Sequence, residues 1–327
     1  MWSELFRHAV PRVARSGSKS QGLLATPALF ALVLACGPLP LAGASEMLVL
    51  IPSADTALLE SFPTNNFGGQ TWLNAGTTQT YKRNRGLLKF DVAGQLPARA
   101  RILAVTLTLQ VTRSPVDGDT PSTFDLHRVL RAWGEGDKHG GPPLLGAPAA
   151  AGECTWTHRF ALSPDLWAEP GGAPGIDYAP DSSADTFVYS EDFSPYAFTS
   201  TSNLVADVQL WQRHPELNFG WMLKTRSEAE NFSARRFATR EDPFLQPVLT
   251  LEYDLPQLQP LAVTNGVVAL SFWLEEGEPC TVEHCDGLSP TVNWRVLADI
   301  PAASARTNVV IFDSVQAEPR FYRLRFR

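Results

Sequence analysis

The sequence predicts an all-β protein, a jelly-roll-type β-sandwich followed by a small Ig/fibronectin-like β domain. Apolar and polar residues alternate along most of the chain after Met47, which is the period of strands with one buried face. The 26 prolines and 23 glycines interrupt these segments often, as turns between short antiparallel strands require. The segment DLPQLQP (254–260) is a predicted linker, and five further strand patterns follow it. We therefore expect a sandwich over 45–255 and a second domain over 260–327.

Residues 1–44 have the layout of a secretory signal peptide. Basic residues precede an apolar run from Leu23 to Ala35, which is too short to span a bilayer, and Ala42-Gly43-Ala44 offers a cleavage site. We expect a secreted, extracellular protein with no membrane span. The alternative is a lipoprotein signal that leaves Cys36 as a lipid anchor.

The charge balance disfavours two classes of partner. Removal of residues 1–44 takes four basic residues and one acidic residue from totals of 27 and 34, which leaves a net charge near −10. Nucleic acids and anionic membranes bind basic surfaces, so neither is an expected partner.

Three cysteines remain beyond residue 44: Cys154, Cys280 and Cys285. The segment CTVEHC between the last two has the pattern of a strand, which would hold their Cα atoms roughly 16 Å apart. A disulfide needs a separation below about 7 Å, so we expect no bond between Cys280 and Cys285. No cysteine or histidine spacing indicates zinc.

The folded part opens with two predicted strands around the corner PTNNFGG (63–69). Gly68 and Gly69 are expected to supply a backbone of positive φ there. In the second strand Leu73 and Ala75 alternate inward, so Trp72 is expected on the outer face.

Three later strands have one clear apolar face. In RILAVTLTLQV the inward residues are predicted to be Leu103, Val105, Leu107, Leu109 and Val111. In PVLTLEYD they are Leu249, Leu251 and Tyr253, and in RGLLKFDV Arg85 and Lys89 are expected on the polar face.

One helix is predicted over 201–214, where Leu204, Val208 and Trp211 recur on one face. Thr201 or Ser202 can cap its start and Pro215 ends it. The segment 134–151 has no usable period and is predicted to be a long surface loop.

The order of motifs over 53–253 resembles a known family. The motifs include ADT, PTNNFGG, RNRGLLKFDV, LHRVLRAWGEG, LVADVQLWQ and RRFATREDPFLQPVLTLEYD, in that order. The series resembles the DNRLRE-type domain, a carbohydrate-binding module of secreted bacterial proteins. The resemblance implies a jelly-roll sandwich that binds polysaccharide, with acidic polysaccharide such as alginate as a ligand class. The C-terminal strands resemble small Ig/fibronectin-like modules of such proteins.

Basic side chains on the strands are the predicted contacts for an acidic glycan. A guanidinium group can bind a uronate carboxylate through two parallel hydrogen bonds. The candidates are Arg83, Arg85, Lys89, Lys224, Arg235, Arg236 and Arg240. The alternative is a solvated sheet face whose cations pair with nearby acids.

Aromatic rings would stack on the C–H faces of a neutral sugar. Trp72, Tyr81 and Trp167 are the candidates for exposed rings, and core packing is the alternative for Trp72. Core or edge positions are predicted for Trp133, Trp156, Trp211 and Trp221.

Calcium is the cofactor that the resemblance implies. Asp55, Glu241 and Asp242 lie near the two ends of the module, which a sandwich brings together, and calcium takes several carboxylate and carbonyl oxygens.

No catalytic motif is present, and Glu135 in WGEG is the single carboxylate selected for a test; a structural acid is its alternative. We expect a secreted, non-catalytic carbohydrate-binding protein, which can associate with another secreted or surface protein. The alternative is a structural or adhesive spacer protein without sugar binding.

Overall fold

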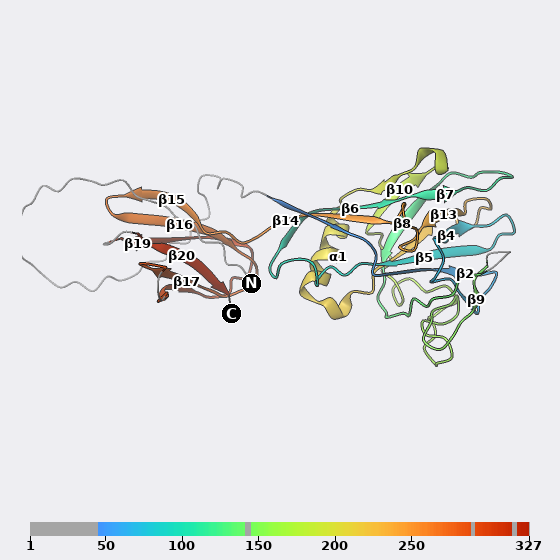
Figure 1. Ribbon diagram of the computed structural model, residues 1–327, viewed down its shortest axis with the longest axis horizontal. Coiled ribbons are helices and arrows are strands. Elements are labelled where there is room, and N and C mark those ends of the chain that lie inside the picture. Colours follow the sequence, from blue (N-terminus) through green and yellow to red (C-terminus); the bar gives the residue numbers. More distant parts are fainter. Residues whose placement is uncertain (1–44, 141–144, 289–291, 316–318, 327) are drawn as a thin grey trace, which may run out of the picture. The chain divides into compact units, whose positions relative to one another are not determined.

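The computed structural model describes residues 45–140, 145–288, 292–315 and 319–326 (Figure 1). The predicted signal peptide and Cys36 lie outside these residues. The chain forms two compact units, and the division falls between Leu255 and Pro256, inside the segment predicted as a linker. Both units are built from antiparallel strands, so the predicted all-β, sandwich-type fold is confirmed.

The larger unit has a four-stranded sheet. Its strands, in spatial order, are β1 (Glu46–Leu50), β14 (Val248–Asp254), β6 (Arg101–Leu109) and β11 (Tyr196–Phe198). Each of its pairs is antiparallel.

An eight-stranded sheet forms the second layer of this unit. Its main path is β10 (Ala184–Val188), β8 (Ser122–Arg128), β12 (Trp221–Thr225), β5 (Arg83–Lys89), β4 (Trp72–Thr77), β13 (Arg235–Ala238) and β7 (Val111–Arg113). The strand β2 (Ala54–Leu59) also pairs with β5. The sheet is curled, so that its two ends approach each other: Nε of Arg235 on β13 donates to the carbonyl of Tyr189, the residue that follows β10, at 2.7 Å.

The main core contains the apolar faces of these strands. Leu107 and Leu109 on β6 and Leu249 and Leu251 on β14 are buried, as the alternation predicts. Leu103 was predicted inward, and this is wrong. A β-bulge leaves Leu103 without a partner on β14, so Ile102 takes the buried position opposite Tyr253.

The predicted helix is present as α1 (Ser202–Arg213) and packs on β6. Oγ1 of Thr201 accepts a hydrogen bond from the amide of Leu204 at 3.0 Å, which caps the first turn. Trp211 is fully buried, 4.4 Å from the ring of Trp221 between centroids. In the part of the chain with assigned structure, no helix has the length and apolar character needed to cross a membrane.

A second, smaller core lies on the other face of the eight-stranded sheet. Leu58 on β2, Leu87 on β5 and Met222 on β12 contribute to it from the sheet. The segment 129–178 covers them with Val129, Cys154, Trp156, Trp167 and Tyr178. Both faces of β5 are therefore buried, which the alternation in RGLLKFDV does not reveal.

The corner at 63–69 contains a two-residue strand, β3 (Asn65–Asn66), which pairs with β9 (Ala147–Pro148). The prediction of positive φ at Gly68 and Gly69 is wrong, since neither residue has it. Glycine is required there because a Cβ atom would lie 2.4 Å from the carbonyl oxygen of Glu135 or of Asp137. Residues 135–138 of the predicted loop thus pack closely on this corner.

The smaller unit is made of two three-stranded sheets. One contains β15 (Gln259–Thr264), β16 (Val267–Leu274) and β19 (Thr307–Ser314), and the other contains β18 (Arg295–Ile300), β17 (Cys280–Cys285) and β20 (Phe321–Phe326). The five predicted strand patterns are confirmed, and β15 is additional. Cys280 and Cys285 lie at opposite ends of β17, as the strand prediction requires.

Candidate functional site

Arg85, a predicted ligand contact, is buried. Its Nε and Nη2 atoms donate to the two carboxylate oxygens of Glu228 at 2.8 and 2.9 Å. Its Nη1 donates to the carbonyls of Gly171 and Gly172. The prediction of an exposed Arg85 is wrong because segment 129–178 covers this face of β5.

Arg235 is also buried, with 1% of its surface exposed. It donates to the carbonyls of Tyr189, Phe232 and Thr120 and pairs with the carboxylate of Asp119. This guanidinium holds neighbouring segments together, so it is not an accessible ligand contact.

The other predicted basic contacts on β5 and β12 do not form one patch. Arg83 pairs with Glu60 at 3.2 Å and Lys224 pairs with Glu228 at 3.4 Å. Lys89 is half-buried at the far end of β5, and Tyr81 is 63% exposed in the turn between β4 and β5. Arg83 and Lys224 therefore follow the alternative interpretation, in which the basic side chains pair with nearby acids.

Arg240 lies in a cluster of carboxylates. Its Nε and Nη2 donate to Glu135 at 2.7 and 2.9 Å, and its Nε lies 3.0 Å from Oε1 of Glu241. Asp55 is fully buried beside them; its Oδ2 accepts from the amide of Arg240, and its amide donates to Glu135. Burial raises the pKa of Asp55 well above its usual value, since the charges of Glu241 and Glu135 add to the effect and outweigh the hydrogen bond and charge of Arg240.

The residues predicted for calcium only partly converge. Oδ1 of Asp55 and Oε2 of Glu241 are buried without a hydrogen-bond partner, whereas Asp242 caps a turn through the amides of Phe244 and Leu245. Calcium takes six to eight oxygen ligands, and the guanidinium of Arg240 already supplies positive charge here. Across the described ranges, no group of three or more acidic, histidine or cysteine side chains is arranged to hold a metal. The donor set therefore does not fit calcium.

Arg236, a predicted contact, pairs with a second arginine, Arg113; Arg113 is exposed and Arg236 is half-buried. They lie directly opposite each other on β13 and β7, so both side chains are on one face of the sheet. Burial and the like charge of Arg113 lower the pKa of Arg236. Among the residues that the structure describes, no carboxylate forms an ion pair with either arginine, although the surface of the protein is rich in such pairs.

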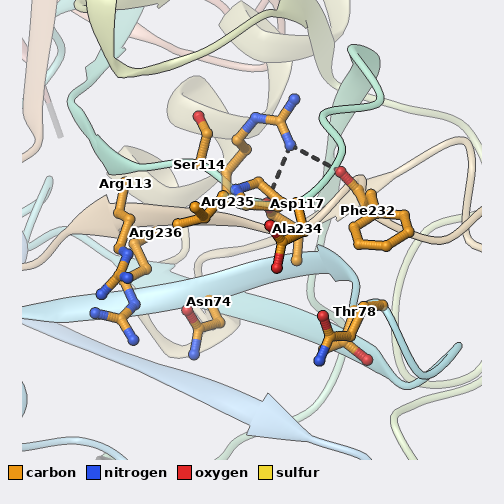
Figure 2. Close-up of a pocket in the computed structure, with 12 residues that line it drawn as sticks. Asn74, Thr78, Arg113, Ser114, Asp117, Phe232, Ala234, Arg235 and Arg236 are labelled. Carbon is orange, nitrogen blue, oxygen red and sulfur yellow. Dashed lines mark hydrogen bonds between the residues drawn. The ribbon is translucent and has the colours of Figure 1, made fainter.

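A pocket of about 390 Å³ lies beside this pair, as Figure 2 shows. The guanidinium groups of Arg113 and Arg236 lie at one end, and Asn74, which is opposite Arg236 on β4, is next to them. Arg235 points away, toward Phe232. Asp117 is the one carboxylate that lines this pocket, and the charge of Arg235 is balanced by Asp119, so the pocket has an excess of positive charge.

Trp72 adds an aromatic surface to the same face. Its ring is half-buried, with the edge of Phe67 at a centroid distance of 6.2 Å, and the guanidinium of Arg236 lies 4.8 Å from its centroid. We call Trp72, Asn74, Arg113 and Arg236 the arginine site. Sequence reasoning identified Trp72 and Arg236 but missed Arg113, since the pairing of β7 with a strand more than 120 residues later leaves no local signal.

Of the remaining predictions for aromatic residues, one is wrong and the others are confirmed. Trp167 was predicted to be exposed, and this is wrong: it is 3% exposed and donates its indole N–H to the carbonyl of Thr155. It fills the smaller core, where segment 129–178 folds over the sheet. Core positions are confirmed for Trp156, Trp211 and Trp221, and Trp133 packs partly against the smaller core.

No family model and no curated protein matches the chain.

Proposed function

We propose that the protein is a secreted, non-catalytic polysaccharide-binding protein whose larger unit is a carbohydrate-binding module of the DNRLRE type. The arginine site binds carboxylate groups of an acidic polysaccharide. The observation that carries this proposal is the unpaired character of Arg113 and Arg236 within the described part of a net-acidic chain.

The geometry supports binding of an anion. Two like charges held opposite each other repel, and a carboxylate between or beside them relieves that repulsion. Each guanidinium can donate two parallel hydrogen bonds to a carboxylate, which a lysine could not do. The half-buried ring of Trp72 and the amide of Asn74 provide an apolar and a polar contact for the rest of a sugar unit.

The environment of Glu135 supports a non-catalytic role. Both of its carboxylate oxygens accept hydrogen bonds from Arg240, and one also accepts from the amide of Asp55. A general acid or base must be able to exchange a proton with a substrate, and these bonds engage the carboxylate inside the fold. This arrangement favours the structural alternative for Glu135.

Binding to sodium alginate and polygalacturonate in affinity gels tests the proposal. Arg113→Ala and Arg236→Ala should each weaken retention of the full chain about tenfold, because each removes a charge-assisted pair of hydrogen bonds. Arg213→Ala is the matched control, since Arg213 is exposed at the end of α1, which packs on β6 of the other sheet. The control should retain the affinity of the parent chain.

The structural or adhesive spacer is the competing proposal. If the parent chain ignores both uronate polymers in low salt, the spacer function is favoured. If binding occurs but Arg113→Ala and Arg236→Ala match Arg213→Ala, the arginine site is not the binding surface.

A further inference from the structure

Three exposed aromatic side chains form a second surface outside the arginine site. They are Phe187 on β10, Tyr189 directly after this strand, and Phe193 in the 3₁₀ turn η1 (Glu191–Phe193), and they are 47, 49 and 65% exposed, respectively. The ring centroids of Phe187 and Tyr189 lie 4.8 Å apart, and those of Tyr189 and Phe193 lie 5.5 Å apart. We call these three residues the aromatic ledge.

The backbone that carries the aromatic ledge is held in place from below. The hydroxyl of Tyr196 accepts hydrogen bonds from the amides of Tyr189 and Ser190 and donates to the carbonyl of Ser190 at 2.7 Å. The buried Nε of Arg235 donates to the carbonyl of Tyr189. Because these contacts fix the segment before any ligand arrives, binding would require little further ordering.

The three side chains of the aromatic ledge expose one contiguous aromatic area. Aromatic side chains of roughly 200 Å² each, about half exposed, leave on the order of 300 Å² in contact with solvent. Contiguous apolar patches of this size are often functional on monomeric proteins. Since β10 is the end strand of its sheet, the aromatic ledge lies at a sheet edge.

The charges around the aromatic ledge identify the kind of ligand. The segment from Ala184 to Ser200 contains Asp185, Glu191 and Asp192 and has no lysine or arginine, and Asp185 pairs with Arg226 of a neighbouring segment at 3.4 Å. The exposed carboxylates of Glu191 and Asp192 would repel a uronate chain. Ionised carboxylates only accept hydrogen bonds, and the hydroxyl groups of a neutral sugar donate them. Aromatic faces for C–H groups and carboxylates for hydroxyls together suit a neutral sugar.

The ring orientations restrict the ligand further. The planes of Phe187 and Tyr189 meet at 69°, and those of Tyr189 and Phe193 at 48°. A flat crystalline polymer needs coplanar rings along its surface. The aromatic ledge instead offers ring faces in different directions, which a twisted, soluble chain can follow.

We propose that the aromatic ledge binds a soluble, neutral polysaccharide chain through residues that are not part of the arginine site; η1 contacts β7, the strand that carries Arg113. The proposal goes beyond the function assigned above and does not depend on it. A chain with both sites would hold a neutral and an acidic polymer.

Affinity electrophoresis of the full chain against hydroxyethylcellulose, galactomannan and laminarin tests this proposal. We expect retention by at least one of the three polymers. Phe187→Ala, Tyr189→Ala and Phe193→Ala should each weaken that retention about fivefold through loss of a stacking face. Phe193→Trp keeps a ring at the same position and should retain binding.

Phe244→Ala is the matched control, because Phe244 is 90% exposed elsewhere on the larger unit. This control should leave retention by the neutral polymer unchanged. Thermal melting of each variant verifies its fold. Loss of alginate binding in Arg113→Ala with neutral-polymer binding intact would separate the two sites.

Three results would overturn the proposal. In the first, the parent chain would not be retained by any of the three neutral polymers. In the second, the three alanine variants would be retained as strongly as Phe244→Ala. In the third, the aromatic ledge would bind poly-L-lysine in preference to every neutral polymer, which would indicate a basic protein partner.

Discussion

Arg85 and Glu228 form a buried bidentate ion pair, in which Nε–Oε1 is 2.8 Å and Nη2–Oε2 is 2.9 Å. The side chain of Arg85 is 6% exposed and that of Glu228 is 18% exposed. Two of the donor positions on Arg85 go to Glu228, and a third reaches the carbonyls of Gly171 and Gly172 in segment 129–178. The pair therefore joins β5 both to the turn after β12 and to the segment that covers it.

Arg85→Ala should lower the free energy of unfolding by about 3–5 kcal/mol, because it leaves Glu228 buried without its main partner. Arg83→Ala is the matched control on the same strand, since Arg83 forms a more exposed pair with Glu60 and should lose about 0–1 kcal/mol. Urea unfolding followed by tryptophan fluorescence measures both. Equal losses in the two variants would contradict the assigned burial.

The same pair predicts acid sensitivity. Burial alone would raise the pKa of Glu228, but the hydrogen bond and charge of Arg85 outweigh it and hold the pKa below 4.5, the ordinary value. A carboxyl with a lowered pKa in the folded state stabilises the fold above its ordinary pKa, and this stabilisation is lost as the pH falls. Glu228→Gln should therefore lower the free energy of unfolding at pH 7. The difference in this free energy between the variant and the parent should become smaller below pH 4.5. A difference independent of pH would contradict this.

Asp55 should have the opposite pH dependence. Its raised pKa means that the folded state binds a proton more tightly than the unfolded state does, so stability falls as the pH rises above the ordinary value of 3.8. Asp55→Asn keeps an oxygen that can accept from the amide of Arg240 and removes the charge. In urea unfolding, the free energy of unfolding of Asp55→Asn relative to that of the parent should be higher at pH 8 than at pH 5. A variant that loses stability equally at both values would show that the charge of Asp55 is not destabilising.

Removal of calcium should leave the melting temperature unchanged. Arg240 supplies the positive charge between Glu135 and Glu241, and Asp242 is engaged in a turn. Differential scanning calorimetry with and without EDTA checks this, with magnesium chloride as the ionic control. A fall in the melting temperature that calcium alone reverses would restore Asp55 and Glu241 as metal ligands.

The bulge in β6 gives a paired test of the core. Ile102 is 5% exposed opposite Tyr253, whereas Leu103 is only half-buried. Ile102→Ala should cost about 2–5 kcal/mol of unfolding free energy, and Leu103→Ala clearly less. Strict alternation along β6 would give the reverse order.

Much of the fold follows from local sequence patterns, because alternation identifies a strand and its apolar face. The strands around Leu107 and Leu251 and the helix at Trp211 are where the patterns place them. Alternation says nothing of what covers the polar face, so by itself it predicts a surface position for Arg85. The cover comes from segment 129–178, which has no regular period of its own.

The candidate site depended on contacts that no local pattern contains. Arg236 and Trp72 were selected as residue types suited to a glycan, but only the pairing of β13 with β4 and β7 brings them together with Arg113 and Asn74. Arg235, the neighbour of Arg236, points to the opposite side of its strand and is buried. Two adjacent arginines thus have different roles because successive strand residues face opposite ways.

The smaller core also makes Cys154 a natural reporter. Cys154 belongs to segment 129–178, and its thiol is fully buried between this segment and the sheet; burial raises its pKa, so the reactive thiolate is suppressed while the segment stays closed. In a chain with Cys280 and Cys285 replaced by alanine, the rate at which Cys154 is alkylated would measure how often segment 129–178 opens away from the sheet. This alkylation rate would report local opening of segment 129–178 separately from global unfolding of the larger unit.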